Sequence, residues 1–361
     1  MEFLINRDDL RDCKVVADTE PPEPAEGQAL LEVDSFGLTA NNVTYAVLGD
    51  GMNYWKFFPG PDGWGRMPVW GFSVVADANG TGLEEGQRIY GYMPPSSHML
   101  VNPVRVDERG FNDGAPHRAD LPSAYQGYRL TEGDEAYIEG KEAEQMLFWP
   151  LFYTSFMLDD FLADEDFFGA ETIVVGSASS KTALIAAYML AQREDTEVIG
   201  LTSPGNREFV EGTGVYASTL GYDEIGELPR RRSVYVDMSG DGEVRAQVHE
   251  HLGDSLAHDC AVGASHWEQL GAGFGDTPGG LPGPPPQVFF APTRIAKRIE
   301  DWGPAEVNER VVAAWKPFVE WSGGWLRVER REGADAVKQT YLEVLDGRIK
   351  PADGHVITLA G

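Results

Sequence analysis

The sequence predicts an α/β protein in which a doubly wound parallel sheet is combined with a separate β-rich catalytic domain. Three observations support this fold class. The 361 residues exceed the usual size of a single hydrophobic core. The first third carries short apolar alternations separated by glycine and proline, and the region after residue 150 alternates apolar strands with helical patterns. Strands spaced by helices indicate right-handed crossovers and a parallel sheet covered on both faces.

In the first third, residues 29–35 alternate like a half-buried strand, and residues 69–76 and 86–92 are further extended segments. Residues 105–145 are rich in acids and glycines and have no clear periodicity, which predicts a surface insertion rather than core. We therefore expect a β-rich domain over residues 1–149.

The parallel sheet is expected over residues 150–323. Helical periodicity covers residues 151–162, 181–192 and 307–319. The expected strands are residues 171–176, 197–202, 233–237, part of 255–262, and 287–290. Residues 271–286 are a glycine- and proline-rich loop. From residue 324 the residue pattern is again typical of β strands, so we expect the C-terminal segment to return to the first domain.

Composition excludes several classes of partner. A formal charge of −29 repels phosphate backbones and anionic lipids, so nucleic acid and membrane surfaces are not expected partners. No apolar stretch approaches the roughly 20 residues of a membrane span, and the N-terminus is charged, which favours a cytoplasmic protein. The two cysteines, Cys13 and Cys260, lie far apart and are expected to be inert thiols.

The strongest chemical signal is the turn between an apolar strand and an apolar helix near residue 176. A pyrophosphate needs backbone amides at a helix N-terminus and side chains small enough to let it approach. The turn provides both through Gly176, Ser177, Ala178, Ser179 and Ser180. The pattern departs from G-x-G-x-x-G because only the first glycine remains, and such small residues also serve simple packing.

Lys181 is the only charged residue in this turn. It either contacts a phosphate or caps the surface of the following helix. Gly176, Lys181 and Thr182 imitate part of a phosphate-binding loop, but the spacing G-x-x-x-x-G-K-[ST] is not met. A phosphate-loop ATPase is therefore disfavoured.

The end of the second strand is where a dinucleotide-binding fold selects its adenosine ribose, and an acidic residue there would bind a free 2′-hydroxyl. This chain instead has Ser203, Asn206 and Arg207, whose hydroxyl, amide and guanidinium donors suit a 2′-phosphate. NADP(H) is therefore favoured over NAD(H). The alternative for Arg207 is a solvated residue in the first turn of a helix.

The order of these elements resembles the medium-chain dehydrogenase/reductase superfamily, in particular its zinc-free quinone and enoyl reductase branches and their divergent bacterial members. The matching segments are residues 30–42, 71–76, 83–91, 154–155, the turn at 176, 234–237 and 347–357. The resemblance implies a GroES-like catalytic domain built from both chain ends and a Rossmann cofactor-binding domain between them. It also implies a nicotinamide cleft and, from related folds, a homodimer.

The resemblance also argues against a catalytic metal. Zinc-dependent members carry Cys and His where this sequence has Thr39 and Ala40, and a Gly-His-Glu motif where it has Gly-Phe-Ser at residues 71–73. A catalytic zinc needs three such ligands, and no other compact set replaces them. We therefore expect no metal in the site.

Without zinc, hydrogen-bond donors must stabilise the developing charge and supply the proton. Asn42 stands at the position of an acidic or amide residue in related reductases, and Tyr45 and Tyr54 follow it; Tyr54 is the preferred proton donor. Tyr153, just before the expected helix entry at residues 154–155, is a further candidate, because the resemblance implies that this segment approaches the nicotinamide. Trp55 and Thr39 are expected substrate contacts, and Phe290 a cofactor contact. Each aromatic residue could equally line a hydrophobic core.

The sequence supports two hypotheses of function. The first is an NADP(H)-dependent, zinc-independent oxidoreductase acting on a small, flat or apolar enone, quinone or carbonyl compound. The second is a catalytically silent protein that kept the fold and a nucleotide or small molecule. The seven histidines form no metal or triad pattern, and His249 and His251 are expected on a surface helix.

Overall fold

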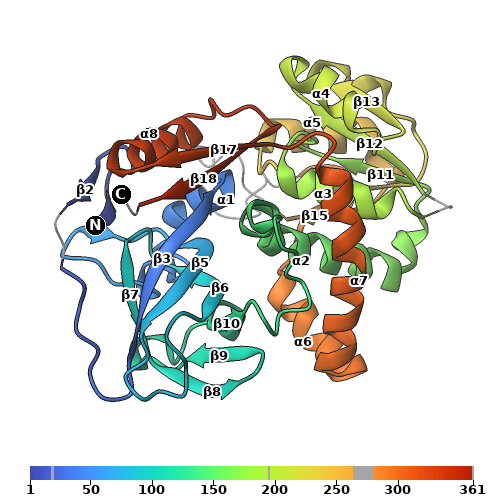
Figure 1. Ribbon diagram of the computed structural model, residues 1–361. Helices are drawn as coiled ribbons and strands as arrows, with labels where there is room; N and C mark the ends of the chain where they lie inside the picture. Colours follow the sequence, from blue (N-terminus) through green and yellow to red (C-terminus); the bar gives the residue numbers. More distant parts are fainter. Residues whose placement is uncertain (18–19, 194–195, 263–279, 360–361) are drawn as a thin grey trace. The chain divides into compact units, whose positions relative to one another are not determined.

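The computed structural model describes residues 1–17, 20–193, 196–262 and 280–359, and the chain forms two compact units (Figure 1). The first unit comprises Met1–Leu147 and Leu326–Gly361, and the second comprises Phe148–Trp325. The sequence placed these boundaries after residues 149 and 323. No helix in the described ranges is long and apolar enough to cross a membrane.

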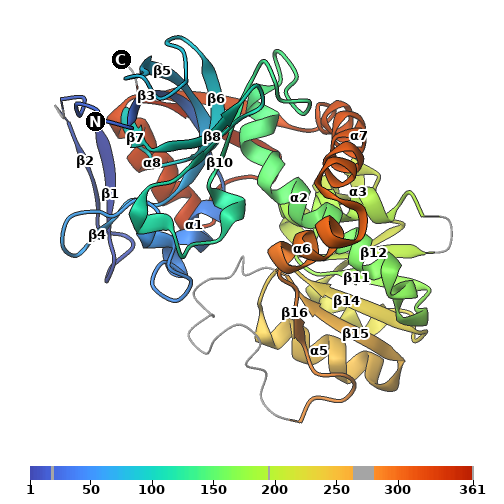
Figure 2. The same ribbon diagram turned by 90° about the horizontal axis from the view of Figure 1, so that it is seen from below.

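The second unit is built on a six-stranded parallel sheet with the order β13-β12-β11-β14-β15-β16. Its strands are β11 (Thr172–Val175), β12 (Glu197–Thr202), β13 (Ser218–Gly221), β14 (Ser233–Asp237), β15 (Leu256–Ala261) and β16 (Gln287–Val288). The chain moves outward from β11 to β13 and then returns beside β11 to continue in the other direction, so the order reverses between β11 and β14. Figure 2 shows β12, β11, β14 and β15 in this order. The prediction of a doubly wound sheet is confirmed.

Helices cover both faces of this sheet. They are α2 (Glu142–Asp164), α3 (Lys181–Leu190), α4 (Arg207–Thr213), α5 (Gly242–Leu252), α6 (Ala291–Trp302) and α7 (Pro304–Ser322). Successive residues of β11 enter different cores, because side chains alternate along a strand. Ile173 and Val175 pack with α2 and α3, whereas Val174 packs with α5. A strand buried on both faces explains the continuous apolar run in its sequence.

Two elements of the second unit differ from the prediction. Helix α2 begins at Glu142 rather than near residue 151, and it continues through Pro150, so Tyr153 lies inside the helix and not before its start. Strand β16 ends at Val288, and Phe290 is already the N-cap of α6. Proline in the first turn of α6 favours a helix start there. The predicted loop 271–286 lies partly outside the described residues, and residues 280–286 contain neither helix nor strand.

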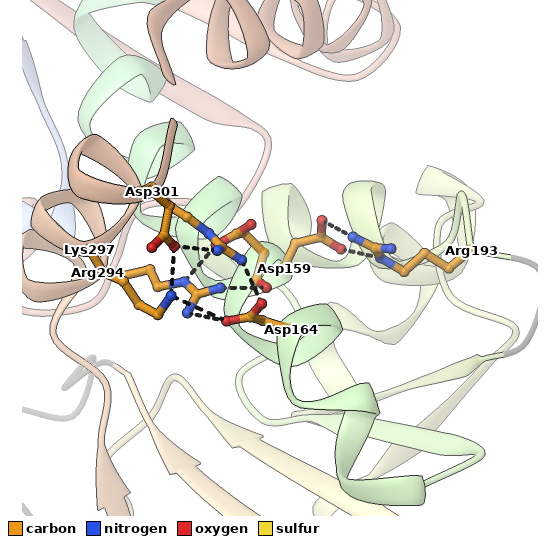
Figure 3. A network of polar contacts seen from close by, with 8 residues as sticks. Asp159, Asp164, Arg193, Arg294, Lys297 and Asp301 are labelled. Carbon is orange, nitrogen blue, oxygen red and sulfur yellow. Dashed lines mark hydrogen bonds and ion pairs between the residues drawn. The ribbon is translucent and has the colours of Figure 1, made fainter. Parts of the chain in front are cut away.

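Ion pairs fasten α6 to α2 (Figure 3). Arg294 and Arg298 are both buried and donate to the Asp160 carboxylate at 2.5 and 2.7 Å. The same arginines contact Asp164 at 2.9 Å. Because an unpaired buried charge is costly, these contacts fix α6 against α2 and thereby fix Phe290, which directly precedes α6.

The first unit contains a nine-stranded sheet with the order β17-β18-β3-β5-β6-β10-β9-β8, with β7 also paired to β3 (Figure 1). It also contains a three-stranded sheet with the order β2-β1-β4 (Figure 2). The strands of the large sheet are β3 (Ala29–Leu38), β5 (Val69–Asp77), β6 (Arg88–Met93), β7 (His98–Val101), β8 (Pro103–Asp107), β9 (Gly110–Asp113), β10 (Gly127–Leu130), β17 (Arg327–Glu332) and β18 (Asp353–Thr358). The small sheet consists of β1 (Glu2–Asn6), β2 (Cys13–Val16) and β4 (Trp64–Gly65), and the helices are α1 (Ala40–Val47) and α8 (Ala334–Leu345). The C-terminal strand β18 pairs with β3, so both chain ends contribute to this unit.

The expected surface insertion at residues 105–145 is wrong in part, because β8, β9 and β10 extend the large sheet. Phe111 and Tyr128 are buried and stacked with ring centroids 5.0 Å apart. The buried Arg118 pairs with Asp113 at 2.8 Å and donates to the Tyr128 hydroxyl at 3.1 Å. Charged residues of this region are buried as ion pairs, so the strands lack the apolar alternation that would mark them in the sequence.

Candidate functional site

The turn after β11 requires a glycine at its first position. A Cβ atom added to Gly176 would lie 2.8 Å from the Tyr235 hydroxyl oxygen, so no larger residue fits without displacement. Ser177 has a φ of 52°, in the left-handed region, and the Ala178 amide donates to the Leu201 carbonyl at 2.9 Å. The backbone therefore turns sharply at the carboxyl end of β11, at the edge where doubly wound sheets bind their ligands.

Helix α3 begins directly after this turn. Ser180 is its N-cap, and the Ser180 hydroxyl accepts a hydrogen bond from the Ala183 amide at 3.3 Å. Lys181 is the first helical residue, and no acidic side chain stands in the first turn. The first amides of a helix have no acceptor within the helix and carry a partial positive charge. The end of α3 therefore suits an anionic group.

The loop after β12 touches this turn. The Asn206 amide nitrogen donates to the Ser179 hydroxyl at 3.1 Å, which joins the residues predicted for ribose and for pyrophosphate. Ser203 is the N-cap of the short 3-10 helix Pro204–Asn206. The buried Thr202 hydroxyl at the end of β12 has no hydrogen-bond partner among the described residues.

Arg207 is engaged by two carboxylates. Its guanidinium contacts the Glu224 oxygens at 2.7 and 3.0 Å and the Glu211 carboxylate at 3.0 Å. The sequence-based prediction considered only residues after β12 and found no carboxylate at the ribose position. Glu224 was missed because it belongs to the 3-10 helix η6 (Tyr222–Glu227), which follows the neighbouring strand β13.

Three tyrosines that the sequence analysis did not select surround the turn. The Tyr216 hydroxyl donates to the Ala178 carbonyl at 3.0 Å, and Tyr235 lies behind Gly176. Tyr222 lies within hydrogen-bonding reach of Ser177, and its burial raises the pKa of its hydroxyl to about 12. The three residues come from separate segments of the chain, so no local pattern marks them.

A buried ion cluster lies next to the turn, at the end of β14. The Asp237 carboxylate accepts from the Ser239 amide and hydroxyl at 2.8 and 2.7 Å and from Arg245 at 2.6 Å. Arg245 also faces Asp259 at 3.3 Å, and the His249 Nε2 lies 2.8 Å from the same Asp259 oxygen. All four ionisable side chains are buried.

His249 is therefore not on a surface, and that prediction is wrong. Its Nδ1 lies 2.8 Å from the Pro282 carbonyl and its Nε2 lies 2.8 Å from Asp259. Burial lowers the pKa of His249, but the hydrogen bonds to Asp259 and Pro282 outweigh burial and raise it above 6.5. The amphipathic pattern of α5 is weak in the sequence because Arg245 and His249 share its buried face with Val244, Val248 and Leu252.

Two predicted residues of the first unit have structural partners. The Asn42 side-chain oxygen accepts from the Thr39 amide at 2.7 Å, and its nitrogen donates to the Pro68 carbonyl at 3.0 Å. Thr39 is the N-cap of α1 and forms a capping box with Asn42. Both side chains therefore stabilise the start of α1.

Tyr45 and Tyr54 belong to an aromatic cluster with Tyr92 and Tyr125, with the Tyr45 and Tyr54 ring centroids 4.7 Å apart. The Tyr45 hydroxyl accepts from Asn41 at 2.8 Å and from Trp70 at 3.3 Å. The Tyr54 hydroxyl lies 3.5 Å from that of Tyr125. Burial raises the pKa of Tyr45 and raises that of Tyr54 to about 12. Both phenols are therefore protonated at neutral pH, in the form that can donate.

The remaining predicted residues lie in different surroundings. Trp55 is buried between Gly49 and Gly65, where an added Cβ would overlap its indole, and it lines a hollow of about 190 Å³ with Trp64. Tyr153 contacts Trp149 edge-on with ring centroids 6.1 Å apart. Phe290 is 40% exposed.

No group of three His, Cys, Asp or Glu side chains in the described part of the chain is arranged to hold a metal ion. Ser73 is fully buried in β5. Cys13 and Cys260 are both free and buried.

The fold is that of solved oxidoreductase structures. CurA from Vibrio vulnificus in complex with NADPH matches with a TM-score of 0.59 and 13% identity, covering 96% of this chain and 94% of that one. YhdH of Escherichia coli K-12 with bound NADPH matches with a TM-score of 0.56 and 15% identity over 100% of both chains. The yhdH oxidoreductase from Salmonella enterica in complex with NADP matches with a TM-score of 0.54 and 15% identity, covering 97% of this chain and 95% of that one.

The molecule thus has the fold of these structures, with a doubly wound parallel sheet in one unit and a β-rich sheet in the other, and the predicted fold class is confirmed. The chain belongs to the family described as "Protein of unknown function (DUF2855)", whose model matches residues 36–350. No curated protein matches its sequence.

Proposed function

We propose that the protein is a zinc-independent, NADP(H)-dependent oxidoreductase for a small, flat or apolar enone, quinone or carbonyl substrate. The observation that carries this proposal is the contact between Asn206 and Ser179, which joins the loop after β12 to the turn that begins at the sterically restricted Gly176. When bound, the nicotinamide supplies or accepts the hydride. The relatives of this fold crystallised with NADPH or NADP support the choice of nucleotide.

Different residues of the second unit are assigned to different parts of the nucleotide. In this proposal the turn and the start of α3 bind the pyrophosphate, through Gly176, Ser177, Ala178, Ser179, Ser180 and Lys181. Ser203, Asn206 and Arg207 bind the phosphorylated ribose, and Phe290 contacts the cofactor from the start of α6. The buried Thr202 hydroxyl supports the fit, because a polar ligand at this edge supplies the partner that it lacks among the described residues.

The first unit provides the substrate side of the proposal. Tyr54 donates the proton to the reduced product, Tyr45 is a further donor in the same unit, and Asn42 stabilises the start of α1. Tyr153, in the second unit, is the third candidate donor. A phenol whose pKa is raised to about 12 remains a neutral hydrogen-bond donor at pH 7. Trp55 and Thr39 are assigned to the surrounding wall of the substrate site.

The second candidate function is a catalytically silent binding protein. It is favoured by the burial of Tyr45 and Tyr54, which are 4% and 7% exposed. Nucleotide binding without any oxidation of NADPH in the presence of quinones, enones and aldehydes supports this second candidate and contradicts the first.

The nucleotide proposal predicts that NADPH binds more tightly than NADH in a fluorescence titration. Arg207→Ala is expected to weaken NADPH binding by about tenfold and to leave NADH binding unchanged, because a charge-assisted contact to the 2′-phosphate is lost. Arg231→Ala is the matched control, since Arg231 pairs with Glu197 at the opposite end of β12. Equal binding of both nucleotides by the unmodified protein contradicts the proposal.

We also propose a cytoplasmic homodimer that pairs two copies along β16. Val288 in this strand is 55% exposed, and β16 is the last strand of the sheet formed by the described residues. Pairing would remove an exposed edge. Light scattering should give twice the chain mass, and Val288→Lys should shift the protein toward the monomer. A single-chain mass across concentration and salt would refute the dimer.

A further inference from the structure

The carboxyl ends of β12 and β13 lie side by side, because Thr202 is in register with Gly221. The segments that follow these strands therefore bring Arg207 and Glu224 together, although the two residues are 17 positions apart. Their contact distances are 2.7 and 3.0 Å.

Glu224 is held more firmly than the other acidic partner of Arg207. One Glu224 oxygen accepts from the Gly221 amide at 2.8 Å, which caps the start of η6. The Gly221 amide and Arg207 keep the pKa of Glu224 below its ordinary value, so the side chain is a carboxylate at neutral pH. Glu211 contacts Arg207 one helical turn away along α4, and its side chain is 54% exposed.

This arrangement places a fixed negative charge against the cation that would bind a 2′-phosphate. A guanidinium already neutralised by a carboxylate has less to gain from a phosphate, and the two anions repel each other. A free ribose 2′-hydroxyl carries no charge, so the same carboxylate does not oppose it and accepts its hydrogen bond.

We propose that Glu224 is a specificity-determining residue of the nucleotide site: it acts as the built-in counter-ion of Arg207 and reduces the preference for a phosphorylated adenosine ribose. The inference rests on the proposed nucleotide-binding function. Glu224 weakens the attraction that Arg207, after β12, exerts on a 2′-phosphate. The preference for NADP(H) over NAD(H) therefore depends on both side chains, Arg207 and Glu224.

The test uses Glu224→Gln in the full chain, because glutamine retains an oxygen acceptor for the Gly221 amide and removes only the charge. Calorimetric titration with adenosine 2′,5′-bisphosphate and with adenosine 5′-monophosphate isolates the part of the nucleotide that this loop would contact. Glu211→Gln is the matched control, since it removes the more exposed partner of the same arginine. Thermal unfolding of each variant checks that η6 remains capped.

Glu224→Gln is expected to tighten binding of the 2′,5′-bisphosphate by about two- to fivefold, the size of one exposed ion pair. Binding of the 5′-monophosphate should stay unchanged or weaken, and Glu211→Gln should have the smaller effect. If Glu224→Gln instead weakens binding of the 2′,5′-bisphosphate, or changes the affinity for both probes equally, Glu224 does not oppose the 2′-phosphate and the inference is wrong. If the unmodified protein binds neither probe nor NADPH, the proposed function itself fails.

Discussion

Arg245→Ala is expected to lower the free energy of unfolding by about 3–5 kcal/mol, the cost of leaving buried charges unpaired. Arg245 is 5% exposed and lies between two carboxylates, Asp237 at 2.6 Å and Asp259 at 3.3 Å. Alanine removes their shared cation and leaves the Asp237 oxygen without its charged donor. Chemical denaturation followed by tryptophan fluorescence measures the change.

The control for this prediction is Arg310→Ala, which removes an arginine paired within the exposed surface of α7. That change should cost about 0–1 kcal/mol, as for other surface ion pairs. A loss below about 1 kcal/mol for Arg245→Ala would mean that water reaches Asp237 and Asp259, so the cluster would not be a buried ion network.

Tyr54→Phe is expected to lower the turnover number by about 10²- to 10⁴-fold, the usual contribution of a well-placed proton donor. The substitution removes only the hydroxyl, which lies 3.5 Å from that of Tyr125, and it retains the ring contacts with Tyr45 and Phe57. Nucleotide affinity should not change, because every residue assigned to the nucleotide lies in the second unit. Steady-state oxidation of NADPH with an accepted substrate provides the measurement.

Tyr137→Phe serves as the control, because Tyr137 donates to Glu142 and belongs to no proposed site. If Tyr54→Phe retains full turnover while the protein oxidises NADPH, the proton comes from another donor such as Tyr45 or Tyr153. The assignment of Tyr54 would then be wrong, and the oxidoreductase proposal would remain.

The sequence alone predicted the parallel sheet and its small-residue turn, because both depend on short-range patterns. β12 runs from Glu197 to Thr202 as expected, since a strand buried on both faces is continuously apolar. The turn at Gly176 was equally readable, because tight backbone turns before a helix require small residues wherever they occur.

Only the tertiary structure decided which charged side chains are paired and which of them are buried. The register of β12 and β13 brings Glu224 to Arg207, and the packing of α5 brings His249 to Asp259. Likewise, the pairing of Arg118 with Asp113 allows an acid-rich stretch to join a sheet. A charged residue has the same identity in solvent and in a core, and its partner decides where it is stable. That partner lies elsewhere in the chain, so local sequence patterns do not contain this information.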